Sequence, residues 1–369
     1  HGVAPPARPV THLSVDLGAF RFKWERHTEF SRYKFIVGSG ADDPFAEPAI
    51  GHVPRAWLDE MPGRTMVAAH VALVQSEAGT PDYEAVAERL FAGHALIGSA
   101  IAGGAATALT DWRIHGDGFS RVLVHNRSML PRQAGRMVQR LLEIDTYRVM
   151  ALLALPVARE LGPKLAAYER ELAEITAQLV GATHADESQL LQRLTRLEAE
   201  IESAEARHHY RFTAAAAYHE LVQRRITELR EERIQGLQTF QEFTDRRLAP
   251  AMNTCASIAM RQDSLSRRVA RATQLLSTRV DVTREGQNQA LLESMNRRAQ
   301  LQLRLQETVE GLSVAAVTYY IVGLVGYGAK GLKSLGVPLH VEITTGVSIP
   351  VVAALVALGV RRIRRAVAA

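Results

Sequence analysis

The pattern of apolar and polar positions divides the chain into a mixed N-terminal part, a long helical part and an apolar C-terminal part. Before residue 130, short apolar runs between turn residues predict five strands, at 33–37, 65–74, 95–102, 108–114 and 119–125. The segment 81–92 predicts a helix with a proline near its start. Between the last two strands, Asp117 and Gly118 both tolerate positive φ and predict a hairpin turn.

From Pro131 the pattern becomes helical, and its Ala, Leu, Glu, Gln and Arg content favours long helices. Pro156 and Gly162-Pro163 predict bends, whereas the segment 181–187 (GATHADE) predicts a break. A second helical run is expected to reach about Arg247, with a turn or kink at Ala249-Pro250.

A third helical run begins near Ala251 and has no proline before the apolar C-terminal part. Its apolar residues recur at spacings of three and four, which predicts a seam between packed helices. These residues are Leu265, Val269, Ala272 and Leu276, then Leu291, Met295, Leu305, Val309 and Leu312. We expect one stalk helix that continues into the apolar segment. The alternative is two or three shorter helices broken near Gly286.

Two apolar runs follow the stalk. The charge-free segment 311–329 is close to the roughly 20 residues that a helix needs to cross a bilayer. The second run, 341–360, contains Pro350 and has one charge, Glu342, at its outer end. A buried hairpin in a soluble core is the alternative, but two such runs followed by RRIRR are more typical of a membrane protein.

These patterns together predict an α+β membrane protein. We expect a small α/β domain over 1–130, a long antiparallel helical hairpin over 131–250 and a stalk helix over 251–310. That stalk is expected to be continuous with the first of two transmembrane helices, which occupy 311–369 with a short outer loop and a basic tail.

Basic residues predict the orientation of the chain in the membrane. The tail carries Arg361, Arg362, Arg364 and Arg365, and an arginine-rich helix precedes the first span, whereas the loop between the spans carries only Lys330 and Lys333. Both termini are therefore expected in the cytoplasm. Since the formal net charge of +5 is concentrated beside an apolar segment, it predicts a contact with the lipid bilayer rather than with nucleic acid.

The single cysteine, Cys255, excludes an intrachain disulfide framework and suits a reducing cytoplasm. No signal peptide is evident, and the chain begins at His1 rather than Met, which leaves earlier residues open.

No motif identifies a catalytic centre, so we assign no catalytic residue, metal ligand or cofactor and do not expect an enzyme. Gly103-Gly104 lacks the rest of a phosphate loop, and no zinc-ligand spacing or dinucleotide fingerprint occurs. The loop His115-Gly116-Asp117-Gly118 is interpreted as a turn rather than an ion-binding loop. His27 and Glu29 are interpreted as part of a salt-bridged contact.

The segments 27–35, 135–161 and 308–327 resemble an uncharacterised bacterial family of predicted membrane-anchored proteins of unknown function, over nearly the whole chain. This resemblance implies a location in the bacterial inner membrane.

The order of the parts is also similar to that of the CorA family of divalent-cation channels. This resemblance implies a homopentamer whose stalk and first-span helices line a central pore. The family signature, Tyr-Gly-Met-Asn, is matched only by Tyr327 and Gly328, because Ala329 and Lys330 follow them here. Five Lys330 ammonium groups around one mouth would repel a divalent cation, so the expected channel is not magnesium-selective and tolerates anions.

A pore-lining stripe follows from the same resemblance by spacings of three and four. Its residues are Glu307, Glu310, Val314, Thr318, Ile321, Val325 and Gly328, with Lys330 at the outer mouth. An inorganic ion is then the expected ligand. The alternative function is a non-conducting, membrane-anchored oligomeric scaffold whose α/β domain binds a cytoplasmic partner.

Overall fold

The computed structural model describes residues 10–38, 40, 42–75, 81–334, 338 and 340–367. The chain divides into two compact units, His1–Gln274 and Leu275–Ala369. Each unit is described by itself. The four-part division expected at residues 130, 250 and 310 stays a prediction.

The first unit begins with a three-stranded antiparallel sheet, which consists of β1 (His12–Asp16), β2 (Arg21–Arg26) and β3 (Ser31–Ile36). Phe22 and Phe35 pack edge-on against Trp57 of the short helix α1 (Arg55–Asp59). A 3-10 helix, η1 (Ala49–His52), precedes α1. Of these strands, only β3 lies at a predicted position, although β1 and β2 also alternate polar and apolar residues as strands do.

A second, five-stranded sheet has the order β4-β7-β6-β5-β8. Its strands are β4 (Ala69–Gln75), β5 (Ile97–Ile101), β6 (Ala106–Thr110), β7 (Ser120–Asn126) and β8 (Glu232–Arg233). Among these strand pairs only β4–β7 is parallel, so the sheet is mixed. The strand predicted over 108–114 begins and ends earlier, because residues 111–119 form the connection to β7.

Helix α2 (Tyr83–Phe91) packs on this sheet through Leu90 and Phe91, which are fully buried beside Leu109 and Leu123. The side chain of Asp82 caps the helix by accepting hydrogen bonds from the backbone N–H of Glu84 and Ala85. Every residue of β6 is buried, so both faces of the sheet are covered at its centre.

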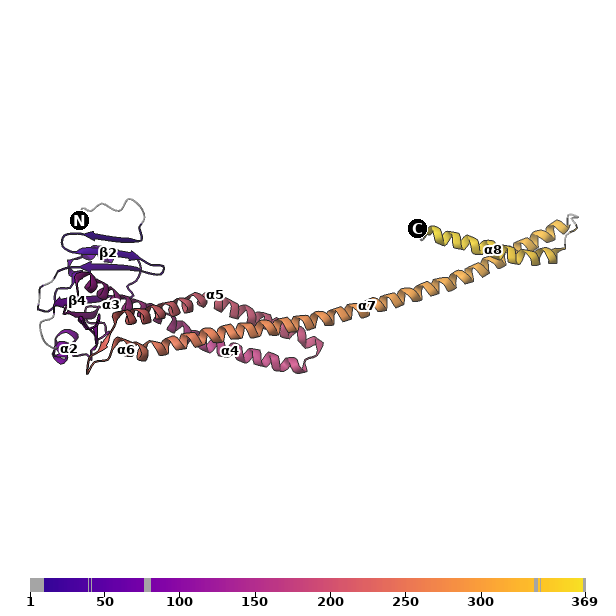
Figure 1. Ribbon diagram of the computed structural model, residues 1–369. Coiled ribbons are helices and arrows are strands. Elements are labelled where there is room, and N and C mark those ends of the chain that lie inside the picture. The colour runs from indigo at the N-terminus through magenta and orange to yellow at the C-terminus, as the bar shows by residue number, and fades with distance from the viewer. Residues whose placement is uncertain are drawn as a thin grey trace. The chain divides into compact units, whose positions relative to one another are not determined.

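Three long helices follow in the first unit, α3 (Pro131–Leu152), α4 (Ala154–Gly181) and α5 (His184–Leu229). The predicted break at 181–187 is confirmed, since α4 ends at Gly181 and Thr183 caps α5. The run expected to reach Arg247 is interrupted by β8, and α6 (Phe240–Arg247) follows. The start of α7 (Ala249–Ser334) packs beside α4 and α5, where Arg261 donates to Glu169 at 2.7 Å and Ser266 donates to Glu202 at 2.7 Å (Figure 1).

The second unit contains the rest of α7 and α8 (Val341–Val367). Helix α7 has no interruption near Gly286, so the predicted single helix is confirmed over 249–334. Both helices contain a stretch long and apolar enough to cross a membrane, and almost none of the residues in either stretch are buried. The two helices approach closely at Gly326, where a Cβ atom would lie 3.3 Å from Thr345 Oγ1.

Candidate functional site

The end of α2 places the first residue of a polar cluster, His94. Ala92 and Gly93 have φ values of 53° and 71°, and their left-handed backbone ends the helix. The Gly93 N–H donates to the Ala87 carbonyl at 2.9 Å, and the His94 N–H donates to the Phe91 carbonyl at 3.1 Å. The chain therefore turns sharply, and His94 lies just before β5.

The register of the sheet brings Asp111 to the same edge as His94. Ile97 at the start of β5 pairs with Thr110 at the end of β6, so the segment that leads into β5, which includes His94, lies near the residue after β6. Asp111 is that next residue, and its Oδ1 accepts a hydrogen bond from the Arg113 N–H at 3.2 Å. This bond fixes the orientation of the carboxylate.

The predicted turn before β7 carries the third residue, His115. The His115 N–H donates to the Phe119 carbonyl at 2.9 Å, and the Gly118 N–H donates to the His115 carbonyl at 2.9 Å. Gly118 has a φ of 85°, as the turn prediction requires. The turn is therefore confirmed, and it also directs the His115 side chain towards Asp111.

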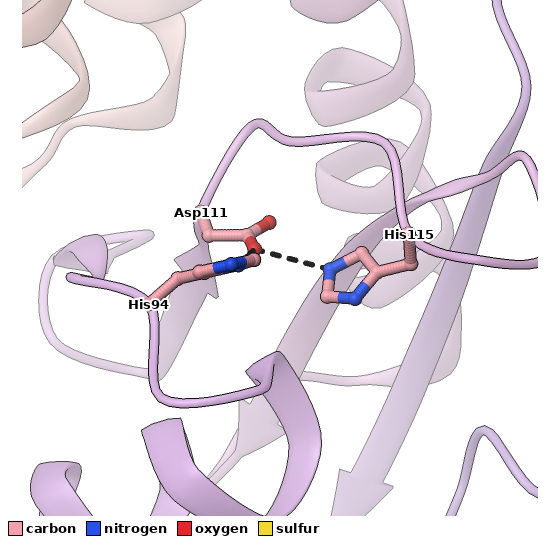
Figure 2. Close-up of side chains that lie close together, drawn as sticks. All are labelled: His94, Asp111 and His115. Carbon is pink, nitrogen blue, oxygen red and sulfur yellow. Dashed lines mark hydrogen bonds and ion pairs between the residues drawn. The ribbon is translucent and has the colours of Figure 1, made fainter.

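Figure 2 shows the three side chains converging on one carboxylate oxygen. Asp111 Oδ2 lies 2.8 Å from His94 Nδ1 and 3.0 Å from His115 Nε2. The Asp111 side chain is 0% exposed and that of His115 is 6% exposed, whereas that of His94 is 31% exposed. The cluster is thus buried on the side of Asp111 and open on the side of His94.

The charge of this cluster is not balanced by a lysine or an arginine among the described residues, where the ion partners of Asp111 are His94 and His115. Although His115 Nε2 lies close to the carboxylate, it has no hydrogen-bond partner of acceptable geometry among those residues. A buried ring nitrogen without an aligned partner is energetically costly.

A second buried polar cluster joins the first sheet to the helices. The Glu143 side chain of α3 is 7% exposed and forms an ion pair with Arg225 of α5. It also accepts a hydrogen bond from Gln139 Nε2 at 2.8 Å and lies 3.5 Å from Arg32 Nη1 of β3. Burial alone raises the pKa of Glu143, but the hydrogen bonds from Gln139 and Arg225 and the charge of Arg32 outweigh burial and hold the pKa below its ordinary value.

The segment interpreted as a salt-bridged contact has that role within the chain. Glu29 accepts a hydrogen bond from Arg211 Nη2 of α5 at 2.6 Å. His27 stacks on Phe30 with ring centroids 4.4 Å apart. These contacts, like those of Glu143, attach the first sheet to the helices.

The predicted pore-lining residues differ in exposure along α7. Glu307, Ile321, Gly328 and Lys330 are exposed, whereas Glu310, Val314, Thr318 and Val325 are half-buried. Gly326, which is also half-buried, meets Thr345 of α8. One chain therefore already covers part of the predicted stripe, and the role of these residues in a pore stays a prediction.

The basic residues flank the apolar stretches as expected. Lys330 and Lys333 are exposed at the end of α7, and the Lys330 ammonium lies 5.8 Å from the centroid of the Tyr327 ring. Arg361 and Arg362 are exposed in α8. Arg364 and Arg365 belong to the same helix, but their side chains lie outside the described residues.

The fold defines a mixed α+β protein with a small N-terminal sheet domain, long helices and two apolar C-terminal helices. The chain belongs to the family described as "Protein of unknown function (DUF3422)", whose model matches residues 1–367. No curated protein matches the chain, and no solved structure matches it either. The expected membership of an uncharacterised family is confirmed, whereas no comparison supports the likeness to the CorA family, which rests on the order of the parts and on Tyr327 and Gly328.

Proposed function

We propose that this protein is a membrane-anchored oligomeric scaffold that holds its first unit in the cytoplasm. The observation that carries this proposal is the exposure of both apolar stretches, because almost none of their residues are buried within the chain. The alternative of a buried hairpin in a soluble core would require these residues to be covered by the rest of the chain.

A bilayer accounts for both the length and the exposure of these helices. A helix satisfies its own backbone hydrogen bonds, so it can lie in hydrocarbon with its apolar side chains in contact with lipid. Pro350 lies inside α8 without ending it, as membrane helices allow. The exposed Arg361 and Arg362 follow the second stretch, which favours an inner-membrane protein with both termini in the cytoplasm.

The part of α7 that precedes the first apolar stretch supports self-association. Its apolar residues Leu291, Met295, Leu305 and Val309, together with Leu312 at the start of the stretch, are all exposed within one chain. Their spacing suits a parallel coiled coil with further copies of the same chain. Anchoring in one membrane would orient the copies alike and raise their local concentration, so we propose a homo-oligomer, with five copies implied by the CorA resemblance.

Extraction of membranes at alkaline pH tests the anchor. The full-length protein is expected to remain with the bilayer after carbonate treatment and to be released by detergent. Release by carbonate alone would contradict two membrane-spanning helices. A peripheral protein from the same cells serves as the control that carbonate has worked.

Ion conduction through a CorA-like pore is a second candidate, favoured by the continuous helix α7 that connects the first unit to an apolar stretch. Its test is Lys330→Glu in planar bilayers. If Lys330 surrounds an outer mouth, reversing its charge shifts the reversal potential in asymmetric salt towards cation preference. An absence of current from the wild-type protein would leave the non-conducting scaffold, and an unchanged reversal potential would remove Lys330 from the conduction path.

A further inference from the structure

We propose that His94, Asp111 and His115 form a binding site for a divalent transition-metal ion of the zinc type in the first unit. This proposal is independent of the membrane anchor and of conduction. It rests on the convergence of three metal-ligating side chains from two loops on one buried oxygen (Figure 2).

The donor set selects the class of ion. Two imidazole nitrogens and one carboxylate oxygen bind zinc and neighbouring first-row metals, whereas magnesium and calcium prefer oxygen donors alone. Three protein ligands leave at least one coordination position for water or another small ligand.

The distances are compatible with an ion after a small adjustment. The three ligand atoms all lie within 4.8 Å of one another, and the two nitrogens lie 2.8 Å and 3.0 Å from Asp111 Oδ2. Metal–ligand bonds of about 2.0–2.2 Å place tetrahedral donors roughly 3.3 Å apart. The two nitrogen–oxygen distances must therefore lengthen by about 0.3–0.5 Å, and the part-exposed His94 side chain has room to move.

The surrounding hydrogen bonds orient Asp111 as a ligand. Its Oδ1 is held by the Arg113 N–H, which leaves Oδ2 directed at the two histidines. Such second contacts to a ligating carboxylate are typical of metal sites.

Electrostatics favours a bound ion over hydrogen bonds alone among His94, Asp111 and His115. A hydrogen-bonded Asp–His pair would satisfy His94 and Asp111, but it leaves the buried His115 Nε2 without an aligned hydrogen-bond partner among the described residues. A divalent cation between the three groups would accept that nitrogen as a ligand and would balance the buried carboxylate. The ion can enter from the side of His94, since its side chain is exposed by about a third.

The test uses the full-length protein in detergent after removal of metals with a chelator. Zinc binding is measured by calorimetry, and cobalt serves as a probe because its visible absorption reports the coordination geometry. We expect one zinc per chain, displacement of cobalt by zinc, and no binding of magnesium at the same concentrations. Binding of less than one zinc per two chains would overturn the proposal.

Variants assign the site. His94→Ala, His115→Ala and Asp111→Asn are each expected to weaken zinc binding by about 100-fold or more. His125→Gln is the matched control, because His125 is a half-buried histidine near the opposite end of β7 from the cluster, and it should bind zinc like the wild type. Circular dichroism of each metal-free variant shows whether it folds. Because the His94 side chain is part-exposed, His94→Ala is the variant whose folding should be disturbed least. Wild-type affinity in a folded His94→Ala protein would overturn the assignment.

Discussion

The indole ring of Trp112 lies with its centroid 4.6 Å from that of Phe243, so the residue next to Asp111 packs directly on α6. Phe240 contacts the same indole with its centroid at 5.5 Å, and the Arg148 guanidinium lies 4.9 Å from the ring centroid. Trp112 has a φ of 47°, which a bulky residue rarely adopts. These contacts hold the backbone beside the proposed metal site in one conformation.

The fluorescence of Trp112 is therefore expected to report zinc binding. A shift of the Asp111 carboxylate on coordination would change the packing of the adjacent indole. The measurement is a zinc titration of Trp24→Phe/Trp57→Phe, which retains Trp112 as its single tryptophan. Adding Asp111→Asn to this background should abolish the change. A constant emission in a protein whose cobalt absorption shows full binding would mean that the site and Trp112 are not coupled.

Removing the carboxylate of Glu143 is expected to destabilise the first unit. Glu143→Gln removes the anion that the buried Arg32 and the half-buried Arg225 share. Because Arg32 keeps its contact with Glu25 and Arg225 keeps Glu228, we expect a loss below the about 3–5 kcal/mol of a buried charge left with no partner. Urea unfolding, followed by circular dichroism, measures the loss. The control is Glu220→Gln, because Glu220 forms an exposed pair with Arg224 and should change the free energy of unfolding by less than about 1 kcal/mol.

The difference in unfolding free energy between the wild type and Glu143→Gln is also expected to depend on pH. Because the folded-state pKa of Glu143 lies below its unfolded value, its ionisation stabilises the fold above the unfolded pKa, and this contribution is lost as the pH falls through the folded pKa. The difference in unfolding free energy between wild type and Glu143→Gln should be constant near neutrality and should shrink below about pH 4.3. A difference that grows on acidification would reverse the sign of this argument.

Cysteine labelling tests the orientation in the membrane. Cys255 is the single cysteine, so Cys255→Ala leaves no thiol to react. Cys255 itself is buried, and burial raises the pKa of its thiol. On that background, Lys333→Cys should react with an impermeant maleimide in spheroplasts. Arg362→Cys should react only after the membrane is opened. The opposite pattern would place both termini outside the cytoplasm.

Self-association through α7 predicts that Leu305→Glu lowers the oligomer mass in detergent. Burial of a leucine contributes about 1.5–3 kcal/mol for each copy, and a charge in the seam would remove this contribution. Light scattering measures the mass. Gln300→Glu introduces the same side chain on the opposite side of the helix and should leave the assembly intact. Equal masses for all three proteins would exclude this seam.

Local patterns in the sequence were sufficient for the helices but not for the candidate metal site. Helix α7 could be predicted because its 3–4 spacing continues without proline from Ala251 onwards, and the apolar stretches stand out by composition alone. His94 and Asp111 are 17 residues apart, and only the pairing of Ile97 with Thr110 brings them together. The one local signal was Asp111 followed by His115 four residues later, directly after a strand, and the turn at Gly118 explained that segment without an ion.

The strand β8 was also invisible in the sequence, because two charged residues, Glu232 and Arg233, show no strand pattern. They become a strand only by pairing with Ser99 and Ala100 of β5. Neither local propensity nor alternation specifies such an element, since its stability comes entirely from the partner strand.

That pairing has a consequence for the timing of folding on the ribosome. The Ser99 hydroxyl donates to Glu231, which is 132 residues further along the chain, and the Gly98 N–H donates to the Gln238 carbonyl. At about 5–20 residues per second, the edge of β5 waits on the order of 10 s for its last strand. During that interval the nascent sheet presents an unpaired edge, which is a target for chaperones and for mispairing with neighbouring nascent chains.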